Sequence, residues 1–350
     1  MSAIADARRV CFFAHHDIDD VVDPYVLHYL GELRSAGFAT VLVTTSPLPP
    51  AEVAKLDGLC ADVIIRENSG LDFGGWADCL ARYPRLSAEF LLLCNDSVYG
   101  PFWKLRAFID ELTSTPADLY GTVLSVHPSP EPHIIQSWFL LLRPTAYDSP
   151  AFREMLEPVP AHLPKQEIIE RYEFQLAHRL ERAGLRAHAA FDPRTRGPLL
   201  AREPANAAYI LWRELLERRI VPFLKIALVR DRPIWVRGLD GWLDVARRID
   251  PHVAELARRN LERRLRARRP VPFAALRDLA FALTNHSAHT PFAKPLLVAD
   301  MDHHARGSAK GRRSAASAGF AVYNAARNLY RAPYKRLYDA VSRQRHTRRV

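Results

Sequence analysis

The chain has 350 residues, of which 48% are hydrophobic and 25% are charged, and its formal net charge is +10. A chain of this length can bury one large core or two modest ones. No apolar run approaches the length that spans a bilayer, and Arg8 and Arg9 interrupt the N-terminal apolar stretch that a signal peptide requires. We therefore expect a cytoplasmic protein.

The positive charge is a property of the C-terminal region. Residues 251–350 contain 21 of the 49 Lys and Arg residues but 6 of the 39 Asp and Glu residues. The first 250 residues are therefore slightly acidic, and the basic character does not belong to the part of the chain that carries the motifs described below.

The first half of the chain alternates short apolar runs with helical patterns, which predicts an α/β sheet flanked by helices. Strands are expected at residues 10–14, 40–45, 62–65, 90–94, 119–124 and 134–142. Helices are expected at residues 24–36, 76–82, 103–112 and 165–183. The continuous apolar runs at 63–65 and 90–93 are typical of strands that are buried on both faces of a parallel sheet.

Four cysteines occur, with neither a Cys-x-x-Cys spacing nor neighbouring histidines. Cys11 and Cys94 lie within expected strands. We therefore expect buried, reduced cysteines rather than disulfides or metal ligands.

Polar residues follow two of the expected strands at the point where each strand ends. The carboxyl ends of parallel strands line the ligand site of such sheets, and glycine lets the backbone approach a ligand closely. Ordinary turns have a similar composition, but the two segments occur together and one helix apart. The residues concerned are Asn68, Gly70, Asp72, Gly74, Gly75, Asn95, Asp96 and Ser97. We interpret them as a nucleotide-sugar site.

These segments resemble the rhamnan synthesis protein F family of polysaccharide glycosyltransferases. The most specific pieces are residues 66–76, with Asn-x-Gly-x-Asp-Phe-Gly, and residues 93–101, with Asn-Asp-Ser-Val-Tyr-Gly-Pro. Further similar pieces lie at residues 12–15, 136–139, 212–215 and 221–225. The sequence departs from the family at residues 206–209, Asn-Ala-Ala-Tyr, where relatives tend to have Asn-Pro-Thr-His.

The resemblance implies a glycosyltransferase A-type (Rossmann-like) mixed sheet and an inverting displacement. The implied donor is a nucleoside diphosphate deoxysugar such as dTDP-rhamnose, and the implied acceptor is a lipid-linked cell-surface polysaccharide. Glu173 falls where a pattern similar to that of cellulose synthase has the catalytic base. The alternative is a solvated helix glutamate that pairs with Arg179 or Arg182.

A divalent cation, Mg²⁺ or Mn²⁺, is expected to offset the charge of the leaving diphosphate, with Asp96 as its ligand. Asn95 and Ser97 would support Asp96 by hydrogen bonds. The triplet has a single carboxylate, which favours fixed cationic side chains as the alternative to a metal.

Three further polar residues are candidates for ligand binding. His15 follows the first strand and would lie near the nucleotide base or ribose, although His15 and His16 could also form a metal pair or a plain loop. Gln136 opens a strand on the acceptor side. Lys225 would bind phosphate or lie exposed at a strand end. Trp76 and Trp138 are expected to fill the core rather than to stack on a sugar.

The expected organisation is a catalytic domain at residues 1–240, a helical extension at 241–284, a flexible linker at 285–319 and a basic amphipathic tail at 320–350. The tail interleaves aromatic and basic residues, which favours an anionic membrane surface over nucleic acid as its partner. The rival function is a non-catalytic, transferase-like binding protein that its tail attaches to membrane or nucleic acid.

Overall fold

The computed structural model describes residues 4–126, 133–157, 159–160, 163–196, 206–233, 236 and 238–267. All of them belong to the first of the two units into which the chain divides. The expected linker, the expected tail and the end of the expected helical extension, from residue 268 to residue 284, lie outside the described residues.

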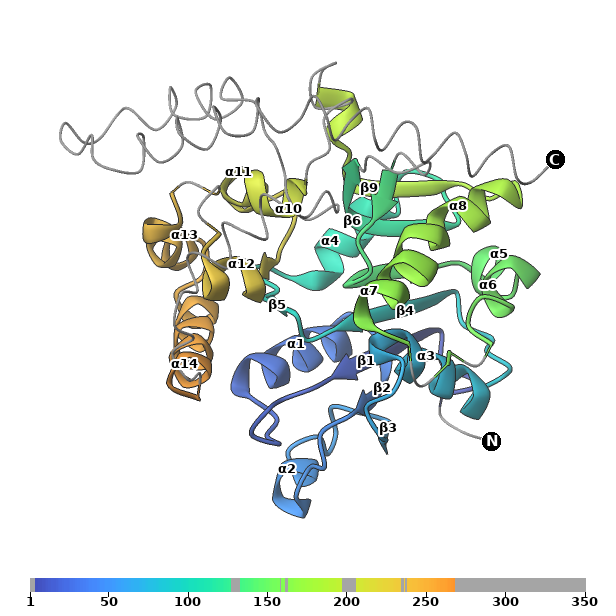
Figure 1. The fold of residues 1–350 in the computed structure, drawn as a ribbon, viewed down its shortest axis with the longest axis horizontal. Helices are drawn as coiled ribbons and strands as arrows, with labels where there is room; N and C mark the ends of the chain where they lie inside the picture. Colours follow the sequence, from blue (N-terminus) through green and yellow to red (C-terminus); the bar gives the residue numbers. More distant parts are fainter. Residues whose placement is uncertain are drawn as a thin grey trace. The chain divides into compact units, whose positions relative to one another are not determined.

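A mixed sheet forms the centre of this unit, and helices flank it (Figure 1). Its strands lie in the order β3-β2-β1-β4-β8-β6-β7, and β9 pairs with β6. Strands β1, β2, β3 and β4 are mutually parallel, β8 runs antiparallel to β4 and β6, and β9 is parallel to β6. The strands are β1 (Arg9–His15), β2 (Ala39–Thr44), β3 (Asp62–Ile65), β4 (Phe90–Asn95), β6 (Leu119–Val126), β7 (His133–Ile135), β8 (Phe139–Leu142) and β9 (Ala187–Phe191). The expected α/β class is confirmed.

A second, two-stranded sheet joins distant parts of the sequence. Strand β5 (Val98–Tyr99) pairs antiparallel with β10 (Leu224–Lys225), so that Lys225 lies opposite Val98. Gly100 makes this approach possible, because a Cβ atom there would lie 2.4 Å from the Pro222 carbonyl oxygen. Two of the pieces that carry the family resemblance are therefore neighbours in space.

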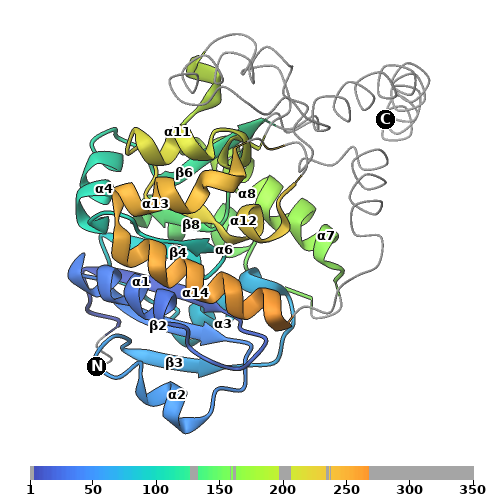
Figure 2. The same ribbon diagram turned by 90° about the vertical axis from the view of Figure 1, so that its left-hand side faces the viewer.

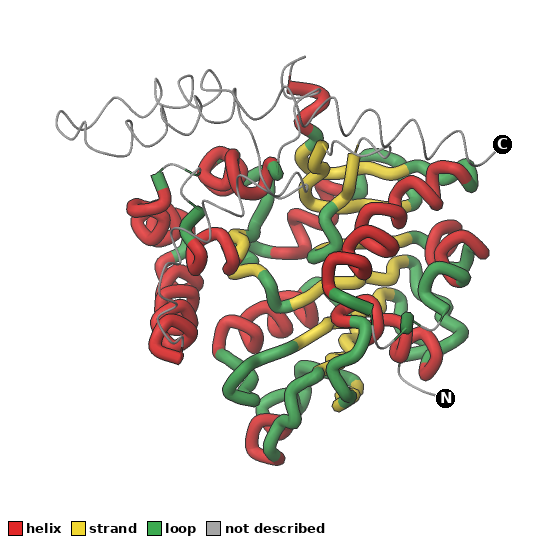
Figure 3. Tube along the Cα trace, viewed as in Figure 1, coloured by secondary structure: helices red, strands yellow, loops and turns green. Residues whose placement is uncertain are grey.

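The helices of the N-terminal half cover the sheet, as the secondary-structure colouring of Figure 3 shows. They are α1 (Pro24–Ser35), α2 (Pro50–Ala54), α3 (Leu71–Arg82), α4 (Leu105–Leu112), α5 (Pro144–Tyr147) and α6 (Pro150–Arg153). Helix α1 has Asp23 as its N-cap and Pro24 in its first turn, an arrangement that satisfies orphan N–H groups and presets φ.

The rest of the described chain contributes several short helices and one long helix beside α1. They are α7 (Lys165–Ile168), the π-helix η1 (Ile169–Glu173), α8 (Phe174–Arg182), η2 (Pro193–Arg196), α10 (Ala207–Ile210), α11 (Trp212–Glu217), α12 (Ile226–Asp231), η3 (Leu239–Gly241), α13 (Trp242–Ile249) and α14 (Pro251–Ala267). Helix α14 packs against α1, α12 and α13, and Figure 2 shows it alongside α1. None of the described helices is both long enough and apolar enough to cross a bilayer.

Three sequence expectations about the elements were wrong. Strand β3 lies at the edge of the sheet rather than within it, and Ile65 is 51% exposed. The strand expected at residues 134–142 is divided into β7 and β8 by a turn at Ser137 and Trp138. Helix α3 begins at Leu71 rather than at residue 76, so that Asp72, Gly74 and Gly75 belong to its first turns.

The buried core contains the residues that the sequence analysis assigned to it. Trp76 and Trp138 are both buried, and Cys11, Cys79 and Cys94 are buried free cysteines. The Sγ atoms of Cys11 and Cys94 lie 3.5 Å apart on adjacent strands. Burial raises the pKa of the Cys11 thiol, so that it behaves as a small apolar side chain.

Candidate functional site

The site lies where β1 and β4 end. Asn95 is the last residue of β4, and its Oδ1 accepts hydrogen bonds from Ser97 N at 3.2 Å and Ser97 Oγ at 2.6 Å. This is the turn that such residues commonly form. The amide nitrogen of Asn95 makes a long-range contact, because Nδ2 donates a hydrogen bond to Asp72 Oδ2 at 2.7 Å. Asn95 thereby joins the two polar segments.

Asp72 and Asp96 are two carboxylates whose negative charges are only partly offset by the groups around them. Burial, together with the nearby charges of Asp96 and Glu173, raises the pKa of Asp72 to about 6. Burial also raises the pKa of Asp96 to about 6, against the lowering effect of Arg264 and His16. Negative charge therefore accumulates at this edge of the sheet, and a positively charged ligand or cofactor would relieve it.

His15 and His16 lie at the end of β1, where the rings contact Thr44 and Thr45 of the neighbouring segment. His15 is buried, its Nδ1 lies 2.9 Å from Thr44 Oγ1, and its Nε2 has no hydrogen-bond partner among the described residues. Burial lowers the pKa of His15 to about 4, so that the ring is neutral at physiological pH. His16 donates from its backbone N to Asp96 Oδ2 at 3.2 Å and fixes the orientation of that carboxylate.

Glu173 lies close enough to Asp72 for its charge to raise the pKa of that carboxyl group. It ends the π-helix η1, a distortion that frequently marks functional sites. Its Oε1 accepts a hydrogen bond from Ser137 N at 3.1 Å. The rings of Tyr172 and Phe73, the neighbours of Glu173 and Asp72, pack with centroids 5.4 Å apart. The carboxylate is part-buried in the site rather than on a solvated helix face.

Lys225 supplies an amine to this acidic group. Its Nζ lies 5.9 Å from the centre of the Trp138 ring, and the β5–β10 pairing holds its backbone beside Val98. Burial lowers the pKa of Lys225, while Glu173 and Asp72 raise it. The Lys225 side chain is part-buried. The alternative from the sequence analysis, a lysine exposed at a strand end, is therefore wrong.

The remaining predicted residues have structural partners or lie apart. The Gln136 side chain donates to Ser125 Oγ and Asn206 Oδ1 and accepts from Trp138 Nε1, which leaves little capacity for a ligand. Asn68 is exposed on the loop before α3. Gly70 has a left-handed backbone, with φ of 69°, as the N-cap of α3. A Cβ at Gly74 would lie 2.3 Å from Ser69 O, so this glycine admits the folded-back loop.

Comparison with known proteins identifies the family that shares these motifs. The family described as rhamnan synthesis protein F matches residues 40–252, which is more than half of the chain. The chain belongs to the rhamnan synthesis protein F family. This membership confirms the resemblance seen in the sequence.

Individual relatives are more distant. An uncharacterised protein, y4gN, of Sinorhizobium fredii is 26% identical over 167 residues, which are 47% of this chain and 44% of the relative. The matched region thus spans less than half of that relative's length. A mannosyltransferase of Pyrobaculum calidifontis, solved with GDP-Man and Mn²⁺, is 13% identical over 93% of this chain and 88% of its own, with a TM-score of 0.37. Residues 1–349 of TarS from S. aureus, solved with UDP, are 14% identical over 72% of this chain and 92% of theirs, with a TM-score of 0.29.

Sequence reasoning missed two arginines of α14, which lies beyond the region that the rhamnan synthesis protein F family matches. Arg264 Nη2 donates to Tyr25 Oη at 3.3 Å, and Tyr25 Oη donates to the Asp96 carbonyl oxygen at 2.9 Å. Arg264 Nε is buried without a hydrogen-bond partner among the described residues. Arg263 pairs with Asp17, Asp19 and Asp23. The sequence predicted a helical extension at residues 241–284, but only the fold brings α14 to the end of β1.

The donor set of the site fits a divalent cation. Mg²⁺ and Mn²⁺ prefer oxygen ligands, and the carboxylates of Asp72 and Asp96 provide them. The Asn-Asp-Ser triplet contains one carboxylate, and the structure adds a second from the first turn of α3 through the Asn95–Asp72 hydrogen bond.

Proposed function

We propose that this protein transfers a deoxysugar, with rhamnose as the first candidate, from a nucleoside diphosphate donor to a lipid-linked cell-surface polysaccharide. The observation that carries the proposal is the grouping of Asp72, Asp96, Glu173 and Lys225 at the carboxyl edge of the sheet. Membership in the rhamnan synthesis protein F family supports the same reaction class.

Each side chain has a role that its surroundings suit. Asp96 and Asp72 hold a divalent cation, which when bound neutralises charge that develops on the leaving diphosphate. Lys225 donates to a phosphate oxygen from its position above Trp138. His15 Nε2, neutral and buried without a partner among the described residues, is available to a ribose hydroxyl or base edge.

Glu173 acts as the general base of an inverting displacement. The acceptor hydroxyl attacks the anomeric carbon, its proton passes to the Glu173 carboxylate, and the bond between that carbon and the diphosphate oxygen breaks. Such a base contributes about 10²–10⁴-fold in rate. The backbone N–H of Ser137 holds Oε1, which leaves Oε2 for the acceptor.

A panel of nucleotide sugars tests the donor proposal. The purified chain is melted with dTDP-rhamnose, GDP-mannose, UDP-glucose or the free nucleotides, each with and without Mg²⁺ or Mn²⁺. A donor at 100 times its Kd adds about 2.7 kcal/mol to the free energy of unfolding. Stabilisation by one nucleotide sugar, followed by its hydrolysis or transfer, supports the proposal. A protein that binds the donor but neither hydrolyses nor transfers it is the non-catalytic alternative.

We further propose that the protein is cytoplasmic and that its basic C-terminal region holds it at an anionic membrane, where a lipid-linked acceptor lies. Support comes from the charge of residues 251–350, since each basic residue near such a surface contributes about 1 kcal/mol. Removal of residues 317–350 should release the protein from anionic vesicles at low salt and preserve donor binding. If the full chain does not bind the vesicles, or binds RNA tightly instead, the membrane proposal is wrong.

A further inference from the structure

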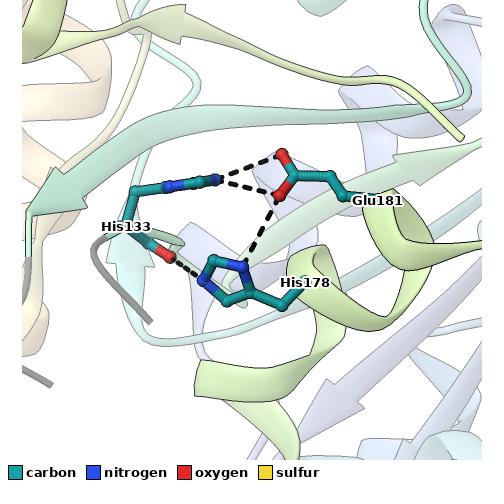
Figure 4. A group of neighbouring side chains, drawn as sticks. All are labelled: His133, His178 and Glu181. Carbon is teal, nitrogen blue, oxygen red and sulfur yellow. Dashed lines mark hydrogen bonds and ion pairs between the residues drawn. The ribbon is translucent and has the colours of Figure 1, made fainter. Parts of the chain in front are cut away.

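Two histidines and a glutamate converge between β7 and α8 (Figure 4). His133 Nε2 lies 3.1 Å from Glu181 Oε1 and 3.2 Å from Oε2. His178 Nδ1 lies 3.6 Å from Glu181 Oε2. One ligand atom from each of the three side chains lies within 4.8 Å of the other two, and the two imidazole centroids are 4.6 Å apart.

His178 makes one hydrogen bond that points away from Glu181. This hydrogen bond determines which of its two ring nitrogens carries a lone pair toward Glu181. His178 Nε2 lies 2.9 Å from the His133 carbonyl oxygen. A carbonyl oxygen only accepts, so Nε2 carries the proton, and Nδ1 of the neutral ring presents a lone pair toward Glu181. Metal-bound histidines are typically held in this way, with the second ring nitrogen donating to a backbone carbonyl.

The rings are largely enclosed, with 13% of the His133 side chain and 10% of the His178 side chain exposed, and they share a single carboxylate. The lone pair of His178 Nδ1 and the carboxylate of Glu181 face each other, so a cation between them would contact both. A single metal ion would bind both ring nitrogens and a carboxylate oxygen at once.

The spacing of the residues also suits a metal. His178 and Glu181 are three residues apart on α8, so they lie on the same face of the helix, and an imidazole and a carboxylate at this spacing serve as ligands in helical metal sites. His133, the first residue of β7, adds the third ligand from another element. Glu181, with 35% of its side chain exposed, can turn to close the site.

We propose that His133, His178 and Glu181 bind one transition-metal ion of the Zn²⁺ class. Two imidazole nitrogens and one carboxylate oxygen match the ligand preference of Zn²⁺, and a fourth position remains for water. With bonds of about 2.0–2.1 Å, tetrahedral ligand atoms lie roughly 3.3 Å apart, which is close to the 3.1 Å from Glu181 Oε1 to His133 Nε2 and the 3.6 Å from Glu181 Oε2 to His178 Nδ1.

Binding at this site would join β7 to α8. Strand β7 continues to Ser137, whose N–H holds Glu173, and Glu173 immediately precedes α8. The site therefore stabilises the pairing of two elements that position the proposed base. The metal proposal does not itself depend on glycosyl transfer, because metal binding is measured directly.

The test is a Zn²⁺ titration of the full chain by isothermal calorimetry after treatment with a chelator. Parallel titration with Co²⁺ reports coordination through visible absorption. Because the chain has 14 histidines, the decisive quantity is the difference between variants. His178→Ala and His133→Ala should each remove one high-affinity equivalent, or weaken it by more than the roughly 10–100-fold that loss of an outer-shell partner causes.

Two further variants keep the result interpretable. Glu181→Gln preserves the size of a half-exposed side chain, so that it should weaken Zn²⁺ binding in a folded protein. His252→Ala is the matched control, because it removes one ring of another histidine pair, His28 and His252, with centroids 6.0 Å apart. The proposal is overturned if the wild type binds no Zn²⁺, if the His178 variant binds as the wild type does, or if His252→Ala loses the same equivalent.

Discussion

Asn95 Nδ2 donates to Asp72 Oδ2 at 2.7 Å, and this hydrogen bond joins the end of β4 to the first turn of α3 across 23 residues. Each residue belongs to one of the two polar segments of the site. The bond places a second carboxylate beside Asp96 and defines the acidic side of the proposed donor site. The predictions below follow from the charges that meet there.

Asp96→Asn should nearly abolish glycosyl transfer while the chain remains folded. Asn keeps the size of the side chain and an acceptor for His16 N, but it removes the charge that a divalent cation requires. Transfer assays with Mg²⁺ or Mn²⁺, with circular dichroism as the folding control, measure this. Near-normal transfer would remove Asp96 from the site, and transfer that survives EDTA would favour Lys225 and Arg264 over a metal.

The raised pKa values of Asp72 and Asp96 predict how stability depends on pH. Both groups have a folded-state pKa of about 6 against a usual value of 3.8, so the native state binds protons that the unfolded state has lost. Their contribution to stability is therefore present below about pH 4 and is lost as the pH rises to about 6. The loss is at most about 3 kcal/mol for each group.

Asp72→Asn tests this relation directly. The variant should unfold at higher denaturant concentration than the wild type at pH 7, and the two midpoints should converge near pH 4. Urea titrations at several pH values, without divalent cations, measure the difference. A variant that is less stable than the wild type at pH 7 would show that the Asn95 hydrogen bond requires the charged carboxylate.

Glu173→Gln should lower turnover by about 10²–10⁴-fold and leave donor affinity nearly unchanged. A base is needed for acceptor attack, whereas donor binding relies on the other side of the site. The measurement is kcat for transfer, together with Kd for the nucleotide sugar. Glu167→Gln is the matched control, since Glu167 pairs with Arg171 on the surface of the adjoining helix. Parallel loss of donor affinity would indicate a structural role for Glu173.

The sequence predicted the sheet and much of the site because the evidence for both is local. Buried strands such as β4 are continuous apolar runs, and the residues at the ends of β1 and β4 become neighbours in any parallel pair. The start of α3 could not be predicted, because Gly74 and Gly75 are typical of loops. The reason for a glycine at position 74 appears only in the structure, where Ser69 O occupies the space that a Cβ atom would need.

The remaining parts of the site depend on contacts that no local pattern contains. Lys225 reaches the acidic group through the β5–β10 pairing, which joins segments more than 120 residues apart. Arg264 reaches it because α14 packs on α1. A basic amphipathic helix shows which face is polar, but it does not show which acidic loop that face will meet.

Lys225→Met should weaken donor binding and keep the fold. Methionine fills the same space beside Trp138, while the hydrogen bond to a charged phosphate is lost, at a cost of about 1.5–3 kcal/mol or roughly 10–150-fold in Kd. Calorimetric titration with the donor and with the free nucleoside diphosphate measures it. Lys104→Met, which alters a lysine paired with Glu32 on the surface, should bind as the wild type does. Equal affinities in the two variants would exclude Lys225 from the phosphate site.

Arg263→Ala should destabilise the protein by about 3 kcal/mol. The guanidinium of Arg263 contacts the carboxylates of Asp17 and Asp23, which are 2% and 6% exposed, and its removal leaves two buried charges without this partner. Arg263 also holds the pKa of Asp17 below its usual value. Its contribution to the free energy of unfolding is therefore present above pH 4 and is lost as the pH falls through the lowered pKa.

Urea unfolding of the wild type and of Arg263→Ala at pH 7 and at pH 3 measures this contribution, and the wild type should be more stable at pH 7 by a margin that shrinks at pH 3. Arg259→Ala is the control on the exposed face of α14, where a pair with Glu255 contributes little. An equal loss of stability at both pH values would mean that Arg263 acts through packing of α14 rather than through its charge.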